Sequence, residues 1–194
     1  MERGVAFLNM KNGVTLIELI VVLGIVALLS TIVFTTFKTA DEALALDRTS
    51  HRLAQDLRRA AQMALRGEVF TCPGAGQIVG YGIHFDNQSA NIRKCYLIYA
   101  ECNNDTVYTG PNCAGGAGTI DGIVERIPLE QGVEITGLSL STPVDVLFVP
   151  PYPLVYIKSD INPGAKLNIT LSLINDTSQS KRVEITQKGA IRIY

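Results

Sequence analysis

The sequence predicts an α+β fold in which one long N-terminal helix packs on an antiparallel β-sheet head. Residues 14–66 contain no proline, and apolar side chains recur there with the period of a helix. Residues 67–194 instead form short β-rich runs that are separated by Gly, Pro and Asn. No second long helical pattern is evident, so successive strands lack crossover helices and are expected to pair antiparallel.

The first half of the predicted helix is apolar on every side. Residues 19–37 contain no charged residue and are long enough to cross ~30 Å of hydrocarbon as a helix. Arg3 and Lys11 precede this run, and positive residues stay on the cytoplasmic side of a membrane. The sequence therefore predicts a single-pass helix with a cytoplasmic N-terminal end, and the residues after Lys38 are expected outside.

The second half of the predicted helix is amphipathic. Apolar residues recur at three- and four-residue steps, which is typical of a helix that packs on a domain. This stripe consists of Leu46, Leu53, Leu57, Ala60, Ala61, Ala64 and Leu65, with Ser50 filling a gap. The opposite face carries Asp47, Arg48, Arg52, Asp56, Arg58 and Arg59. We expect the stripe to face the strands and the charged face to lie in solvent.

Nine β-rich runs follow the helix. They cover residues 81–85, 92–100, 120–129, 133–141, 144–149, 154–158, 166–174, 182–187 and 190–194. Such a series predicts an antiparallel sheet or sandwich that buries one face against the helix stripe. The polar, glycine-rich segment 103–118 lies between two of the runs, and we expect it to form an exposed, variable surface.

All four cysteines, Cys72, Cys95, Cys102 and Cys113, follow the apolar run. An even number of cysteines in an oxidising compartment predicts two disulfides, for which three connectivities exist. The favoured pairing joins Cys102 to Cys113, which closes a polar loop, and leaves Cys72 with Cys95. Zinc binding needs close ligand pairs, and the sequence has neither a C-x-x-C motif nor a histidine near these cysteines. No metal or cofactor is therefore expected.

Glu18 is the acidic residue that opens the apolar run. A carboxylate in hydrocarbon costs several kcal/mol, about 3 on insertion scales, so Glu18 is expected to have a partner. Residues 11–20, KNGVTLIELI, resemble the processing and assembly signal of type IV pilins and type II secretion pseudopilins. The resemblance implies that a prepilin peptidase cuts after Gly13, that Val14 becomes the methylated first residue, and that Glu18 acts in assembly.

The resemblance also implies how the chain is organised. Residues 1–13 would be a cytoplasmic leader that is cleaved, residues 14–66 the membrane-spanning and packing helix, and residues 67–194 an extracytoplasmic β head, together a pilin-like lollipop. Translation from Met10 rather than Met1 would preserve the same cleavage site. The family usually has phenylalanine where this chain has Val14, and many major pilins have proline where it has Thr35. The likeness to a major fibre subunit is therefore weaker, and the most similar subtype is a minor pilin or, from the C-terminal residues 187–192, a minor H-type pseudopilin.

The implied partners are the prepilin peptidase, the membrane, and other pilin or pseudopilin subunits that bundle through their helices. The subunit would wait in the inner membrane with its head outside and then enter an extracellular fibre or a periplasmic pseudopilus. A plain uncleaved anchor is the alternative for residues 19–37, but it explains neither Glu18 nor Gly13. A membrane-anchored adhesin or binding module that never polymerises remains a further alternative.

The C-terminus is basic. Lys181, Arg182, Lys188 and Arg192 accompany only Glu184 there, although the chain as a whole has a net charge of −1. Residues 187–192 resemble the basic end of minor pilins that capture DNA and of minor H-type pseudopilins, except that Ala190 stands where an arginine is expected. Such a patch binds phosphates in a salt-dependent way, but four positive residues are few. A solvated terminal strand is the simpler interpretation.

An enzymatic function is not expected. Catalysis by a nucleophile needs a neighbouring base, and the only histidines are His51 and His84. His51 lies on the polar helix face and His84 in an alternating strand, and neither adjoins a nucleophile in the sequence. The acidic residues of the head are scattered, so a calcium site would have to be assembled by loops.

Overall fold

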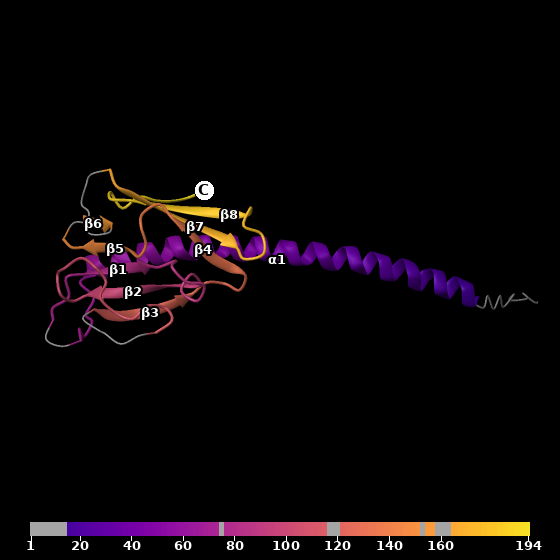
Figure 1. Ribbon diagram of the computed structural model, residues 1–194, viewed down its shortest axis with the longest axis horizontal. Coiled ribbons are helices and arrows are strands. Elements are labelled where there is room, and N and C mark those ends of the chain that lie inside the picture. Colours follow the sequence, from indigo (N-terminus) through magenta and orange to yellow (C-terminus); the bar gives the residue numbers. More distant parts are fainter. Residues whose placement is uncertain (1–14, 74–75, 116–120, 152–153, 158–163) are drawn as a thin grey trace, which may run out of the picture. The chain divides into compact units, whose positions relative to one another are not determined.

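The computed structural model describes residues 15–73, 76–115, 121–151, 154–157 and 164–194, except for the side chains of residues 32–39. The chain divides into two compact units, Met1–Ala40 and Asp41–Tyr194. The described residues contain one helix, α1 (Leu16–Arg66), and nine strands that pair antiparallel (Figure 1). The predicted α+β fold is therefore confirmed.

The first unit contains the beginning of α1. Every described side chain from Leu16 to Thr31 is exposed, including the large apolar ones. Ser30 and Thr31 direct their hydroxyls to the carbonyls of Val26 and Ala27, at 2.7 and 3.0 Å, so these hydroxyls satisfy their hydrogen bonds within the helix. Within the described residues no helix is both long and apolar enough to cross a membrane. The expected span, residues 19–37, extends into residues 32–37, whose side chains lie outside the described part of the chain.

The second unit begins with the amphipathic half of α1. The predicted stripe is confirmed at Leu46, Leu53, Leu57, Ala60 and Ala64, which are all buried. The same face also buries Ala45, Thr49, Ser50, Ala54 and Met63. Leu65 was wrongly placed on the stripe, because it lies in the last turn of the helix and is 50% exposed.

The strands are β1 (Gly80–Phe85), β2 (Cys95–Glu101), β3 (Gly122–Pro128), β4 (Val133–Leu138), β5 (Val144–Val149), β6 (Leu154–Ile157), β7 (Lys166–Leu173), β8 (Ser180–Thr186) and β9 (Ile191–Ile193). They form two sheets. The larger has the order β3-β2-β1-β5-β6, and the smaller has the order β4-β7-β8-β9. Each of the nine β-rich runs predicted from the sequence overlaps one of these strands.

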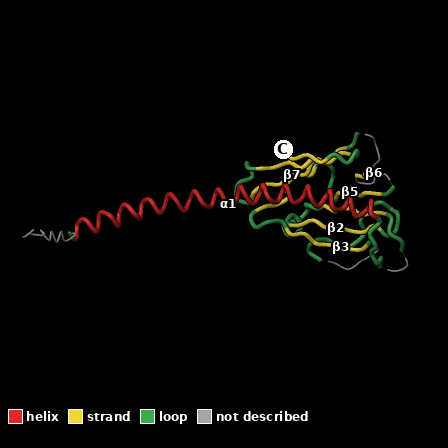
Figure 2. Tube along the Cα trace, turned by 180° about the vertical axis from the view of Figure 1, so that it is seen from behind, coloured by secondary structure: helices red, strands yellow, loops and turns green. Residues whose placement is uncertain are grey.

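One hydrophobic core joins the helix stripe to both sheets. In strands β1 and β2 alternate residues face it, namely Tyr81, Ile83 and Phe85, and Tyr96, Ile98 and Ala100. Strands β7 and β8 add their own alternating apolar residues to the same cluster. Figure 2 shows the second half of α1 running alongside the strands of both sheets. The helix therefore serves as the common support of the head.

Polar contacts fix the helix on the sheets. The Tyr96 hydroxyl donates a hydrogen bond of 2.6 Å to Oδ2 of Asp56, which is only 9% exposed. Asp56 was predicted on the solvent face, but the phenol of Tyr96 reaches it from β2 and covers it. Nearer the ends of the stripe, Arg59 pairs with Glu125 and Arg48 with Glu130. Lys181 of β8 adds a link to Asp47.

Two disulfides form, but the favoured pairing was wrong. Cys72 is joined to Cys102, and Cys95 to Cys113. Cys95 begins β2 and Cys102 directly follows its end, so the two cysteines stand seven positions apart. Because side chains alternate along a strand, an odd separation places the two cysteines on opposite faces of the sheet. Cys102 therefore joins Cys72 in the core, whereas Cys95 meets Cys113 on the outer face.

Candidate functional site

The N-terminal motif lies partly outside the described residues. Gly13 and Val14 fall among residues 1–14, so the predicted cleavage site carries no structural description. Thr15 is the first described residue and caps the helix, because its Oγ1 accepts a hydrogen bond of 3.3 Å from the backbone N–H of Glu18. A threonine followed three residues later by glutamate is the sequence pattern of a capping box. The motif thus fixes where α1 begins.

Glu18 lies in the first turn of α1. A negative charge is favourable there, because the unpaired N–H groups make the helix N-terminus electropositive. Its side chain is exposed, as are those of its neighbours Leu16, Ile17, Leu19 and Ile20. Among the described residues Glu18 forms no ion pair.

The structure separates Lys181 from the other three basic residues near the C-terminus. Lys181 points toward α1, where its Nζ lies 2.9 Å from Oδ1 of Asp47. Arg182 and Arg192 are exposed residues of β8 and β9, and Lys188 is exposed in the turn between these strands. The four residues thus do not form one cluster, because alternation along β8 sends Lys181 and Arg182 to opposite faces.

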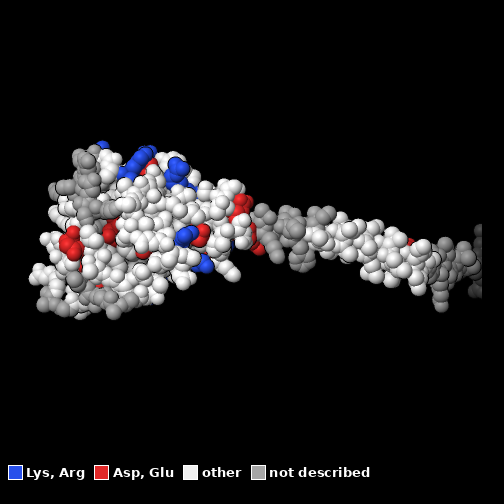
Figure 3. Space-filling model, viewed as in Figure 1, with Lys and Arg blue, Asp and Glu red and all other residues white. Residues whose placement is uncertain are grey.

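Lys166 is a basic residue of this region that the sequence analysis missed. It lies on β7 and lines a hollow of about 450 Å³ together with Arg182. Asn168, Thr170, Ser180, Glu184 and Tyr194 complete that lining. Lysine and arginine side chains gather at this side of the head, over β7 and β8 (Figure 3). Lys166 Nζ is 3.3 Å from Glu184 Oε2, so one carboxylate partly neutralises the group.

The segment between β2 and β3 comprises residues 102–121, and its described part packs on the outer face of the larger sheet through Tyr108. We call it the outer loop; the structure describes its residues 102–115 and 121. Part of it is exposed, as predicted, including Asn103, Asn104, Asp105 and Val107. Tyr108, however, is buried against Leu97, Tyr99 and Leu147 in a second hydrophobic cluster. The outer loop is therefore anchored on the sheet rather than freely exposed.

His84 has a structural partner in this region. Its Nδ1 lies 2.7 Å from Oδ1 of Asp145, and both side chains are buried. The second oxygen of Asp145 accepts a hydrogen bond of 3.3 Å from the Tyr108 N–H, and the His84 ring lies 4.7 Å from the Tyr108 ring. The pair thus holds the outer loop on the sheet. His51 instead contacts the backbone and carboxylate of Asp47 on α1.

All four cysteines are consumed by disulfides. In the part of the chain that the structure describes, no group of three or more His, Cys, Asp and Glu side chains is arranged to hold a metal ion. The described contacts therefore supply links between elements: helix to sheet, and outer loop to sheet.

Comparison with known proteins bears on the N-terminal motif. A search of curated proteins and a search of solved structures gave no match. Residues 8–34 match the family model of the prokaryotic N-terminal methylation motif. These residues include Gly13, Val14 and Glu18. The motif implies a membrane-anchored precursor, processing by a prepilin peptidase and assembly with other pilin subunits. The chain carries the N-terminal signal of type IV pilins and pseudopilins.

Proposed function

We propose that this chain is a minor pilin or pseudopilin, a structural subunit rather than an enzyme. Its leader is removed after Gly13, and its helix then bundles with those of other subunits in a type IV pilus or a type II secretion pseudopilus. The observation that carries this proposal is the methylation motif over residues 8–34, with Glu18 in the first turn of α1. The precursor waits in the inner membrane with its head in an oxidising compartment, which the two disulfides support.

The exposed start of α1 supports an assembly role. Its apolar side chains are about half exposed or more from Leu16 to Leu29, and contiguous apolar surface of this kind marks an interaction site. Lipid covers this surface before assembly, and the helices of neighbouring subunits cover it afterwards. The helix thus exchanges one apolar environment for another when the subunit leaves the membrane.

Glu18 sets the register in which the helices of neighbouring subunits align. Cleavage after Gly13 frees the amine of Val14, and this cation is the partner that we assign to the Glu18 carboxylate of a neighbouring subunit. An ion pair is strong in a medium of low dielectric constant, and an unpaired carboxylate is costly there. Helices that bundle out of register leave the carboxylate without its partner. The pair therefore selects one alignment of the helices.

The variant Glu18→Ala tests this role. We expect leader cleavage to stay intact, because the peptidase reads Gly13, and incorporation into sheared fibres or crosslinked pseudopilus oligomers to fall sharply. Ile17→Ala is the comparison variant, since it shortens an exposed neighbour on the assembly surface and keeps the charge, so it reports the loss of apolar contact alone. Normal incorporation of Glu18→Ala would remove the pairing from the proposal. A wild-type chain that stays wholly with the membranes would favour a non-polymerising adhesin or binding module instead.

DNA capture is a second candidate function, because Lys166, Arg182 and Arg192 all belong to the strands β7, β8 and β9 and are exposed. Tyr194, 60% exposed, adds an aromatic ring on which a base can stack. The variants Arg182→Ala and Arg192→Ala are then expected to reduce salt-sensitive retention of DNA by the full chain in detergent. Arg58→Ala, on the exposed face of α1, is the control. Retention that none of these variants changes would rule out this candidate.

A further inference from the structure

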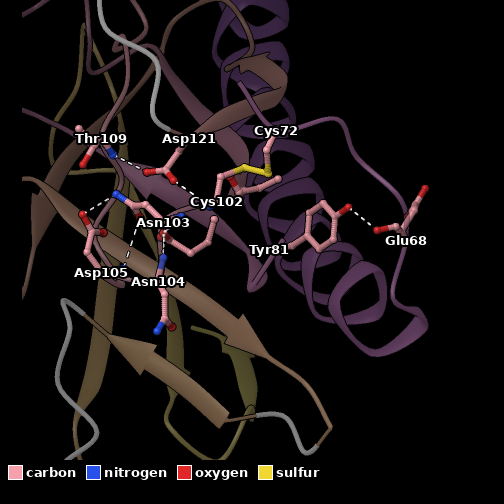
Figure 4. Close-up of a disulfide and its surroundings, with 11 residues drawn as sticks. Glu68, Cys72, Tyr81, Cys102, Asn103, Asn104, Asp105, Thr109 and Asp121 are labelled. Atoms are coloured by element: carbon pink, nitrogen blue, oxygen red, sulfur yellow. Dashed lines mark hydrogen bonds between the residues drawn. A yellow bond between two sulfur atoms is a disulfide. The ribbon is translucent and has the colours of Figure 1, made fainter. Parts of the chain in front are cut away.

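The outer loop is held at both of its ends by buried carboxyl groups. Glu101 ends β2, and its Oε1 accepts hydrogen bonds from the N–H groups of Asn103 and Asn104, at 3.2 and 3.1 Å. Asp121 closes the loop, and its two oxygens accept hydrogen bonds from Cys102 N–H at 3.0 Å and Thr109 N–H at 2.7 Å. Figure 4 shows Asp121 between Cys102 and Thr109. Two carboxyl groups thus fix four backbone amides of one loop.

Glu101 and Asp121 are fully buried, at 0% exposure. No ion pair among the described residues involves either group. Oε2 of Glu101 is buried and receives no hydrogen bond from a described donor. Ionising both of two neighbouring buried carboxyl groups costs free energy, because each charge is poorly solvated and repels the other.

The remaining charged groups near the pair do not relieve this repulsion. Asp105 of the outer loop adds a further negative charge, and Tyr99 of β2 contributes a neutral phenol. On the neighbouring strands β1 and β5, His84 is already engaged by Asp145. Burial is the largest influence on Glu101, followed by the charge of Asp121, and together they raise the pKa of Glu101 to about 7. Burial also raises the pKa of Asp121, although its backbone donors oppose the change.

We propose that Glu101 and Asp121 share one proton and act as a pH-sensitive clasp for the outer loop. With the proton in place, one carboxyl group donates a hydrogen bond to the other, and the loop is held on the sheet. Loss of the proton leaves two buried anions, and the segment that they hold opens. The disulfides at Cys102 and Cys113 fix the chain at both ends of residues 103–112, so the opening is limited to this segment. This inference does not depend on the proposed function.

The backbone of the outer loop favours such an opening. Asn104 and Thr106 both have positive φ, at 63° and 64°, and this left-handed region is strained for a β-branched residue such as threonine. The clasp holds Asn104 directly through its N–H. Release of the clasp therefore also frees a segment that is held in an unfavourable conformation.

The direction of the pH dependence follows from the raised pKa. A carboxyl group whose pKa is higher in the folded state binds its proton more tightly there, so its stabilising effect is complete below the ordinary pKa of 4.5. That effect is lost as the pH rises through about 7. The clasp is therefore closed in mild acid and open in mild base. The two groups titrate as a coupled pair, so the pH at which the clasp opens is a property of the pair and not of either residue alone.

Hydrogen exchange of the full chain in mild detergent tests the proposal. After correction for intrinsic rates, we expect the protection of the Asn103, Asn104 and Thr109 amides to fall at least about tenfold between pH ~5.5 and ~8.5. In Glu101→Gln the amide keeps an acceptor for the loop and donates to Asp121 at every pH. Protection in that variant is expected to be independent of pH. Glu68→Gln, an exposed glutamate of the same head, is expected to behave as the wild type.

Several results would overturn the proposal. One is a wild-type loop whose protection does not change with pH. Another is a Glu101→Gln loop that keeps the wild-type pH dependence, which would place the titrating group outside the clasp. Restoration of protection by Ca²⁺ at pH ~8.5 would show that the pair binds a cation rather than a proton. If Glu101→Gln does not fold, Asp121→Asn replaces it, with the same expected loss of pH dependence.

Discussion

Replacing Tyr96 with phenylalanine removes one hydrogen bond between β2 and α1 and leaves the aromatic ring in place. The lost bond is short, 2.6 Å, and its acceptor is the Asp56 carboxylate. Tyr96 is 1% exposed and Asp56 is 9% exposed, so water cannot easily replace the hydroxyl. A hydrogen bond to a charged group contributes about 1.5–3 kcal/mol, and we expect Tyr96→Phe to lower the free energy of unfolding by about 2 kcal/mol.

The measurement is urea unfolding of the full chain in mild detergent, followed by circular dichroism. With a denaturant slope of about 2 kcal/mol/M, the midpoint is expected to fall by about 1 M. Tyr81→Phe is the matched control, because its hydroxyl donates to a neutral acceptor, the backbone carbonyl of Glu68, at 2.7 Å. That variant is expected to lose about 1 kcal/mol. A loss for Tyr96→Phe no greater than for Tyr81→Phe would refute the reasoning that charge and burial strengthen the bond to Asp56.

The remaining predictions concern the core, the sheet and the disulfides. Leu57 is fully buried, and we expect Leu57→Ala to lower the free energy of unfolding in urea by about 3 kcal/mol. Leu65 is half exposed, and we expect Leu65→Ala to change that free energy by less than about 0.5 kcal/mol. Similar losses for the two variants would contradict the orientation of the helix. Gly82→Ala is expected to lower the thermal midpoint, because a Cβ there would lie 2.6 Å from the Tyr99 ring, and an unchanged midpoint would count against this packing. Non-reducing digestion followed by mass spectrometry is expected to recover the two disulfides described above, and any other pairing would contradict the path of the outer loop.

Much of the fold follows from local patterns. Each strand is a short β-rich run bounded by turn residues, and the helix stripe has a clear period, so both could be predicted. The predicted run 92–100 began too early, because residues 92–94 form a turn in which Ile92 N–H bonds to Ser89. Asp56 was placed on the wrong side because its burial depends on a tyrosine forty residues away.

The disulfide pairing and the carboxyl clasp depend on tertiary structure. The pairing depends on which face of β2 each cysteine occupies. The odd separation of Cys95 and Cys102 could have predicted opposite faces if the predicted run 92–100 had been extended to Cys102. Glu101 and Asp121 carry no motif, and the antiparallel register of β2 and β3, in which Ala100 pairs with Gly122, brings them together.

The N-terminal motif could be predicted because its residues act through their own short sequence. Glu18 and Thr15 also form the helix start that the pattern indicates. The basic residues of the head are a different case, since the exposure of Lys166 beside Arg182 depends on the pairing of β7 with β8. The positions of basic residues along the sequence instead grouped Lys181 with the other C-terminal basic residues, although Lys181 pairs with Asp47 of α1.

The mass of the N-terminal peptide tests most directly whether this chain is processed as a pilin-type subunit. In cells that contain the prepilin peptidase, the peptide is expected to begin at Val14 and to carry one added methyl group. In otherwise identical cells without the peptidase, it is expected to begin upstream of Gly13. The same N-terminus in both cells, or an unmethylated N-terminus away from Val14 when the peptidase is present, would contradict the proposed processing.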